Sequence, residues 1–185
     1  MSELRRQAIA ATEAAWERFA EAKGLTLRPS SGSFGAEEEP RVGGDLDGVS
    51  VAFKLANMDG SWGVMAVGVP RAPLAVHLEV VREGMLEKIA KFFGAKDLIL
   101  GDAAFDPQYL VRVTNDDAGR ALLTPPVRRD MLSLGVRSLS YSDGSTGERS
   151  AILSFEIPRL LTEPRELEVM LGLIVAIAKV TPPVA

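Results

Sequence analysis

The sequence has no cysteine and a single histidine, His77. Without cysteine there can be no disulfide, thiolate nucleophile, zinc–thiolate site or cysteine-bound iron–sulfur cluster. A single histidine excludes metal sites that need several imidazoles. As the base of a Ser-His-Asp triad it would need a Gly-x-Ser-x-Gly nucleophile turn, and no such segment is present. We therefore expect no catalytic residues, no metal and no cofactor, and we favour a protein that is not an enzyme.

The sequence also lacks an excess of basic charge and any long apolar run. Its 21 basic residues are outnumbered by 25 acidic ones, giving a net charge of −4. This balance argues against nucleic acid as the main partner. The longest apolar run, residues 169–178, is shorter than the roughly 20 residues that span a bilayer. Because the first residues show no signal-peptide core either, we expect a cytoplasmic protein that does not insert into membranes.

The 185 residues fit one domain, and their hydrophobic periodicity predicts its elements. Residues 1–24 predict an N-terminal helix that could be appended to the domain, and residues 29–39 read as a loop. Alternating apolar residues predict an antiparallel meander over residues 40–83, with turns at Asp47-Gly48 and Asp59-Gly60. Later predicted elements are a helix at 85–93, strands at 98–100 and 109–114, helices at 115–123 and 127–134, strands at 138–141 and 151–157, and a helix at 164–179. This order predicts an α+β fold with a mainly antiparallel sheet and the terminal helices packed on it.

The densest pattern lies at residues 101–113, where Asp102 and Asp106 precede a strand. The two carboxylates could act as an acid–base pair or bind a divalent metal. We favour the interpretation that both accept backbone N–H bonds in turns, because Pro107 and the following strand argue against a helix that would place them on one face. Phe105 and Tyr109 could line a ligand pocket, but core packing is the favoured interpretation.

The same region carries a family resemblance. Its elements are Gly94, Gly101-Asp102, Phe105-Asp106, Tyr109, Val111, Asp116, Leu122-Leu123, Arg128 and Leu132, together with the upstream Val42-Gly43 and Asp47-Gly48. The segment resembles a group of bacterial domain-of-unknown-function proteins with the signature G-D-x-x-F-D-x-x-[FY]-x-V, over about residues 40–160. The resemblance implies a shared fold and no mechanism, so no catalytic residue is carried over.

Arg128, beside Arg129, could bind an anion at a helix start, although a solvated helix face is favoured.

The last predicted helix is apolar around most of its circumference. Leu167, Met170, Leu171, Ile174 and Ile177 form an arc wider than the stripe of about 100° that a surface helix needs. Burial across the sheet of the same chain is the favoured explanation. A homodimer interface and one wall of an apolar ligand cavity remain open.

Three functions follow from these features. The leading hypothesis is a non-catalytic binding or assembly module that self-associates or docks on a protein partner through the last helix. The alternative is a carrier or sensor of a small apolar ligand, held in a cavity under that helix. The weakest is a metal-dependent enzyme that uses Asp102 and Asp106.

Overall fold

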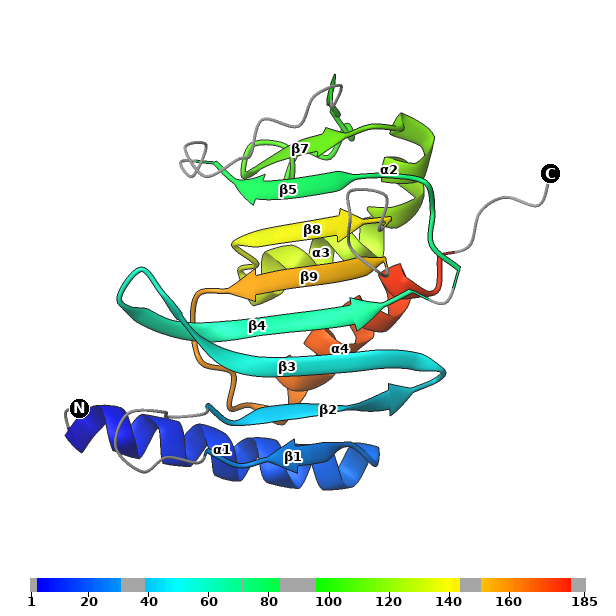
Figure 1. Ribbon diagram of the computed structural model, residues 1–185. Helices are drawn as coiled ribbons and strands as arrows, with labels where there is room; N and C mark the ends of the chain where they lie inside the picture. The colour runs from blue at the N-terminus through cyan, green and yellow to red at the C-terminus, as the bar shows by residue number, and fades with distance from the viewer. Residues whose placement is uncertain (1–2, 31–38, 71, 84–95, 144–150, 181–185) are drawn as a thin grey trace.

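The computed structural model describes residues 3–30, 39–70, 72–83, 96–143 and 151–180. The fold is α+β with an antiparallel sheet, as the sequence predicts. Within these ranges the strands form one sheet of nine in the order β1-β2-β3-β4-β9-β8-β5-β7-β6 (Figure 1). The strands are β1 Thr26–Arg28, β2 Arg41–Leu46, β3 Val49–Met58, β4 Ser61–Val69, β5 Leu78–Arg82, β6 Lys96–Asp97, β7 Tyr109–Val113, β8 Ser138–Ser142 and β9 Ile152–Ile157. The helices are α1 Glu3–Lys23, α2 Asp116–Leu122, α3 Pro125–Leu134 and α4 Pro164–Ala178.

The two predicted hairpin turns set the register of β2, β3 and β4. Asp47 and Gly48 both have positive φ, 50° and 77°, as do Asp59 and Gly60, 55° and 90°. These values suit the two-residue turns that match strand twist, in which Asp-Gly is a favoured pair. Both hairpins are therefore confirmed, and burial alternates over residues 49–55 of β3 and 64–69 of β4.

The predicted meander over residues 40–83 is wrong at its last strand. β5 does not pair with β4; it pairs with β8 on one side and β7 on the other. The two C-terminal strands β9 and β8 lie between β4 and β5. Alternation reports which face of a strand is buried, but not which strand lies beside it.

Other boundaries also differ from the prediction: α3 begins at Pro125 rather than at residue 127, and several ends shift by one residue. Leu98–Leu100 is not a strand; the short pairing with β7 is made by β6, just before it. In the last part of the predicted meander, the strand β5 begins only at Leu78, although burial alternates from Leu74 onward. The helix predicted at 85–93 and most of the 29–39 loop lie outside the described residues.

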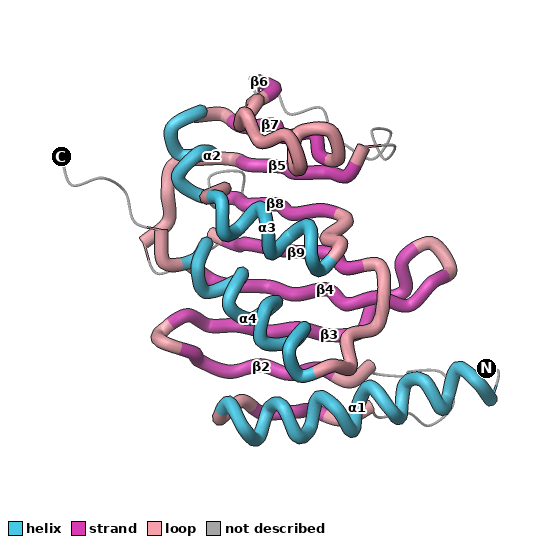
Figure 2. Tube along the Cα trace, turned by 180° about the vertical axis from the view of Figure 1, so that it is seen from behind, coloured by secondary structure: helices cyan, strands magenta, loops and turns pink. Residues whose placement is uncertain are grey.

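The helices gather on one face of the sheet. Seen from behind, α4 crosses β3 and β4, α3 lies beside it and α1 runs along the β1–β2 end (Figure 2). We call the opposite side, which no described helix covers, the helix-free face (Figure 1). None of the helices within the described ranges combines the length and the apolar character that crossing a bilayer requires.

The N-terminal helix contributes directly to the core. Trp16 of α1 is fully buried, and its ring meets Phe53 of β3 edge-to-face with centroids 4.8 Å apart. Its indole Nε1 donates a 2.8 Å hydrogen bond to the carbonyl of Leu161, just before α4. α1 therefore joins the first half of the sheet to the C-terminal segment.

Candidate functional site

The candidate residues of the last helix lie inside the chain's own core. Leu167, Met170, Leu171, Ile174 and Ile177 are each at most 2% exposed. Their helix, α4, packs against β3, β4, β9, α3 and α1. This burial on several sides explains the wide apolar arc, and it leaves these side chains no part in an exposed interface of the monomer.

Contact between α4 and the sheet is close. A Cβ atom built on Gly68 of β4 would lie 2.5 Å from Cγ2 of Ile174, nearer than real atoms approach. The helix rests directly on the backbone of β4 at this point. A ligand cavity under α4, as the carrier hypothesis placed it, has no room here.

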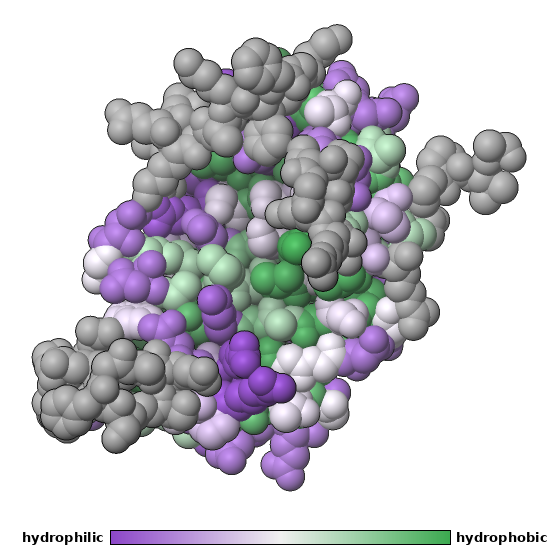
Figure 3. Space-filling model, viewed as in Figure 1, coloured by the Kyte–Doolittle hydropathy of each residue, from purple (hydrophilic) through white to green (hydrophobic). Residues whose placement is uncertain are grey.

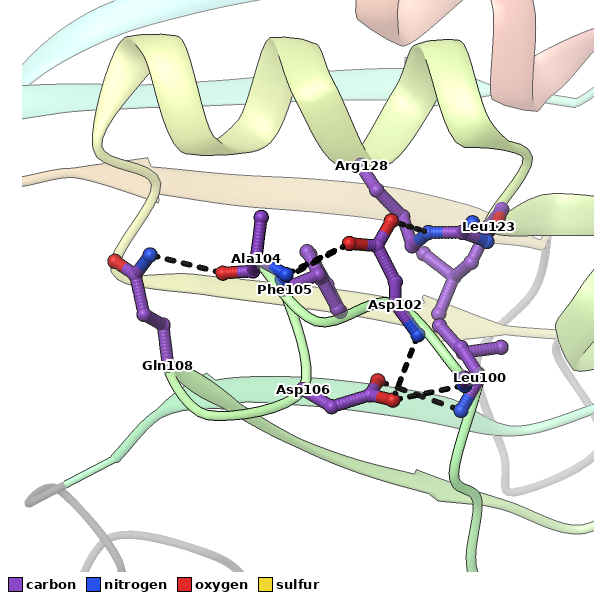
Figure 4. Close-up of polar contacts among 9 residues, drawn as sticks. Leu100, Asp102, Ala104, Phe105, Asp106, Gln108, Leu123 and Arg128 are labelled. Carbon is purple, nitrogen blue, oxygen red and sulfur yellow. Dashed lines mark hydrogen bonds and ion pairs between the residues drawn. The ribbon is translucent and has the colours of Figure 1, made fainter.

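Asp102 and Asp106 hold the backbone of the loop that precedes β7 (Figure 4). Asp102 Oδ1 accepts the N–H groups of Ala104 and Phe105 at 3.0 and 3.2 Å. Asp106 Oδ2 accepts those of Gly101 and Asp102 at 2.8 and 2.9 Å, and its Oδ1 accepts that of Leu100 at 3.3 Å. Each carboxylate organises a turn.

Arg128 joins this loop to two helices. Its Nε donates a 2.7 Å hydrogen bond to Asp102 Oδ2, and its Nη1 donates a 2.7 Å bond to the carbonyl of Leu123, after α2 (Figure 4). The Arg128 side chain is only 13% exposed. A guanidinium engaged in this way anchors the start of α3 and is not available to bind an external anion.

The two aromatic residues of the segment are core side chains. Phe105 and Tyr109 stack with ring centroids 4.6 Å apart, and both are at most 5% exposed. The Tyr109 hydroxyl donates to the carbonyl of Val136 at 2.7 Å, and burial raises the pKa of this phenol. The structure thus brings Asp102, Phe105, Asp106, Tyr109 and Arg128 together in one cluster, which ties the loop to α3 and to the connection between α3 and β8.

The cluster predicts a pH dependence of stability. The Arg128 guanidinium and the Ala104 N–H, which donate to Asp102, lower the pKa of that carboxyl below its ordinary value. The stability that the ionised Asp102 carboxylate contributes is fully present above the ordinary pKa of the group. It is lost as the pH falls through the lowered pKa. We expect Asp102→Asn to reduce the loss of unfolding free energy between pH 6 and pH 3, measured by urea titration. Glu17→Gln, an exposed change on α1, should leave the wild-type pH dependence in place; an unchanged profile in Asp102→Asn would contradict the assignment.

The described part of the chain contains no group of side chains suited to bind a metal ion. No group of three or more His, Asp or Glu side chains there is arranged to hold an ion. The oxygens of Asp102 and Asp106 are already engaged by backbone N–H groups and Arg128. The arrangement at this loop is that of a structural brace.

The helix-free face presents a strip of apolar side chains. Met65, Val67 and Val69 of β4 point to this face, because Val64, Ala66 and Gly68 between them are buried on the helix side. Val69 is 38% exposed, and Met65 and Val67 are half-buried. Figure 3 shows hydrophobic residues gathered over the middle of this face. We call these three residues of β4 the apolar strip; it is about 13 Å long at the usual strand rise.

Polar or small residues flank the apolar strip on the neighbouring strands. Met65 lies between Lys54 and Glu156, and Val67 lies between Ala52 and Ser154. The hydroxyl of Ser154 on β9 shares a 2.7 Å hydrogen bond with that of Ser140 on β8, the next strand. The strip is therefore one strand wide at Met65 and Val67, and the half-buried Ile152 of β9, next in sequence to the Gly68 partner Leu153, widens it at the Val69 end.

A cavity of about 440 Å³ adjoins the strip at the β1–β3 end of the same face. Its lining residues are Thr26, Arg28, Arg41, Val42, Gly43 and Ala52. Thr26, Gly43 and Ala52 are cross-strand partners in one row, which continues to Val67. Small side chains thus connect the cavity with the strip.

The other end of the helix-free face carries acidic groups. Glu79 of β5 lies opposite Arg112, and its Oε2 is buried without a hydrogen bond. Burial raises the pKa of this carboxyl, and the charge of Arg112 partly opposes the rise. The side chain of the nearby His77 is 17% exposed, and its Nε2 lies 3.3 Å from Asp143 Oδ1. His77 is therefore half-buried and not a fully exposed surface residue.

Sequence reasoning missed the strip and the cavity. The alternation in β4 predicts a buried face, but it does not by itself show that the residues on the uncovered face are apolar as well. The signal was present in the residues of β4 on the helix-free face, where Met65, Val67 and Val69 succeed one another without a polar residue. A one-sided antiparallel sheet would ordinarily show polar residues at such positions.

Comparison with known proteins shows a structural likeness. No family model matches the chain, and no curated protein matches it. The crystal structure of the mycobacterial trehalose monomycolate transport factor A, TtfA, is similar with a TM-score of 0.60 and 14% sequence identity. The match covers 94% of this chain and 98% of the other. At this identity the likeness shows that the fold is shared.

Proposed function

We propose that this chain is a non-catalytic binding protein that carries a small molecule with an apolar part on the helix-free face of its sheet. The observation that carries the proposal is the apolar strip, which lies beside a cavity of about 440 Å³. That volume falls in the usual range of small-molecule sites. The place differs from the cavity under α4 that the sequence suggested, because α4 is packed directly on β4.

The shape of the strip favours a small ligand over a protein partner. A stable protein interface buries about 800 Å² on each side around a broad apolar centre. Over Met65 and Val67 the strip is one strand wide, with Lys54 and Glu156 flanking Met65, and it widens only by Ile152 at the Val69 end. Such a surface suits a single extended hydrocarbon chain. Docking through α4, the leading hypothesis from sequence, has no exposed apolar arc to rely on.

The shared fold supports, by analogy, the proposal that this chain carries a small molecule. The solved neighbour is named as a trehalose monomycolate transport factor. A fold hosts many functions, so the argument for this chain depends on its own strip and cavity.

The proposal predicts that the strip binds an apolar fluorescent probe. N-phenyl-1-naphthylamine, which is neutral and brightens in apolar surroundings, should bind the wild-type protein saturably. The double change Val67→Thr with Val69→Thr keeps the β-branched shape and adds a hydroxyl at each site. We expect the dissociation constant of this double variant for the probe to rise about tenfold. Replacing two methyl groups by hydroxyls removes part of the apolar surface that the probe buries when it binds.

Ile99→Thr is the matched control. Ile99 is 74% exposed and lies in the loop after β6, so removing its apolar surface should not change probe binding. Circular dichroism establishes that each variant is folded. A wild-type protein that does not bind the probe, or a strip variant that binds it as wild type does, would refute the proposal.

A further inference from the structure

Three basic side chains stand in a single cross-strand row next to the cavity. Arg28 of β1 pairs with Arg41 of β2, and Arg41 pairs with Lys54 of β3. Directly paired residues project from the same side of a sheet. Leu27 and Val42, which alternate with them, face the helices, so the three cations lie on the helix-free face. We call Arg28, Arg41 and Lys54 the basic row.

The fold gains no stability from this arrangement. Like charges directly opposite one another on adjacent strands destabilise a sheet. Within the described part of the chain, none of the three side chains makes an ion pair or hydrogen bond. Among the described residues of these strands, the carboxylates on this part of the face outside the row are Asp45, farther along β2, and Glu156, beyond Met65. Glu156 lies 3.9 Å from Arg137.

Protection of a sheet edge does not account for the row. Charged residues on an edge strand do deter pairing with other chains. Arg28 occupies such an edge, but Arg41 and Lys54 lie on β2 and β3, each of which is paired on both sides. A row that costs stability in the interior of the sheet needs another explanation.

The row is joined to both parts of the proposed binding site. Arg28 and Arg41 line the cavity, and Lys54 is the direct cross-strand partner of Met65, where the apolar strip begins. Figure 3 shows the strongly hydrophilic surface over β2 and β3 beside the hydrophobic surface over the middle of the sheet. One molecule could contact both surfaces.

We propose that the ligand is an anionic amphiphile, whose phosphate or carboxylate head binds the basic row in the cavity and whose apolar chain follows Met65, Val67 and Val69. Guanidinium groups bind such oxyanions with paired, charge-assisted hydrogen bonds, and Lys54 adds a point charge. This inference rests on the proposed function and adds the chemical class of the ligand.

The test compares three compounds that separate head from chain. Decyl phosphate, 1-decanol and inorganic phosphate are each titrated against wild-type protein loaded with N-phenyl-1-naphthylamine, and direct binding is measured by calorimetry at low salt. We expect decyl phosphate to bind about tenfold more tightly than 1-decanol, with the difference shrinking as salt screens the charges. Inorganic phosphate should bind weakly and displace no probe.

The double variant Arg41→Gln with Lys54→Gln should abolish the preference for decyl phosphate while 1-decanol binds as before. Arg165→Gln, an exposed change on α4 on the other side of the sheet, should retain the preference. Equal binding of the two decyl compounds by wild type overturns the inference and leaves the proposed function standing. Inorganic phosphate binding as tightly as decyl phosphate would indicate a free-anion site and also overturns it. Failure of both decyl compounds to bind would refute the proposed function itself.

Thermal stability gives an independent readout. Because the row consists of like charges, Arg41→Gln should raise the melting temperature or leave it unchanged while it weakens decyl phosphate binding. A residue retained for structure would lower the melting temperature when replaced, and that result would overturn the assignment.

Discussion

Replacing Ile174 by aspartate is expected to unfold the protein. The side chain is fully buried between α4 and the sheet, and its Cγ2 lies against the backbone of β4 at Gly68. A carboxylate placed there has no partner, and an unpaired buried charge costs more than about 4 kcal/mol. Because natural domains have a stability of only about 5–15 kcal/mol, most of the folded population should be lost. Circular dichroism and urea titration measure the effect.

Ala176→Asp is the control on the same helix. Ala176 is exposed two residues away, so the same new charge should change stability by no more than about 0.5–1 kcal/mol. The comparison also decides the role of α4. A folded Ile174→Asp protein with a smaller native mass than wild type would show that the helix is an interface and would contradict its place in the core.

Trp16→Ala is the second large effect that we expect. The indole fills the space against Phe53 and donates to the Leu161 carbonyl, so its removal leaves both a cavity and an unpaired carbonyl. Truncation of a buried tryptophan costs about 3–5 kcal/mol. Equilibrium unfolding in urea, followed by circular dichroism, gives the value.

Two further variants separate packing from the hydrogen bond. Trp16→Phe keeps much of the aromatic volume but loses the donor, and should cost about 1–3 kcal/mol. Glu17→Ala changes the exposed neighbour and should stay within about 0.5 kcal/mol. If α1 were an appended helix that folds apart from the sheet, Trp16→Ala would leave the main transition unchanged.

Local patterns were sufficient to predict most elements of the fold. Helical spacing predicted an N-terminal helix within residues 1–24, where α1 spans Glu3–Lys23, and the two Asp-Gly pairs predicted both hairpins. The place of β5 could not be predicted, because it depends on pairing with β8, whose residues are distant in sequence. Local sequence determines the alternation of each strand, whereas the order of strands is decided by packing across the whole chain.

The basic row shows why candidate sites are harder to find than elements. Arg28, Arg41 and Lys54 are far apart in sequence, so no run of basic residues marks them. Yet Arg41 lies six positions before Asp47 and Lys54 six positions after Gly48, so a two-residue turn there places them opposite one another. Reading the predicted hairpin for its cross-strand pairs would have found this half of the row. The pairing of Arg28 with Arg41 spans a longer connection and follows from no local rule.

The pairing of β4 with β9 has a consequence for how the chain reaches this state. The register joins residues 64–68 to residues 153–157, so the two halves of the sheet meet only through a contact between distant parts of the sequence. Contacts of this kind slow folding, because the connecting chain must be ordered before they form. During synthesis, β4 would end the first half as a long edge with unpaired backbone groups until β9 has emerged. Among the described residues, the edges of the finished sheet are β1 and β6. The β4 edge is therefore exposed only during folding, because β9 covers it in the finished sheet.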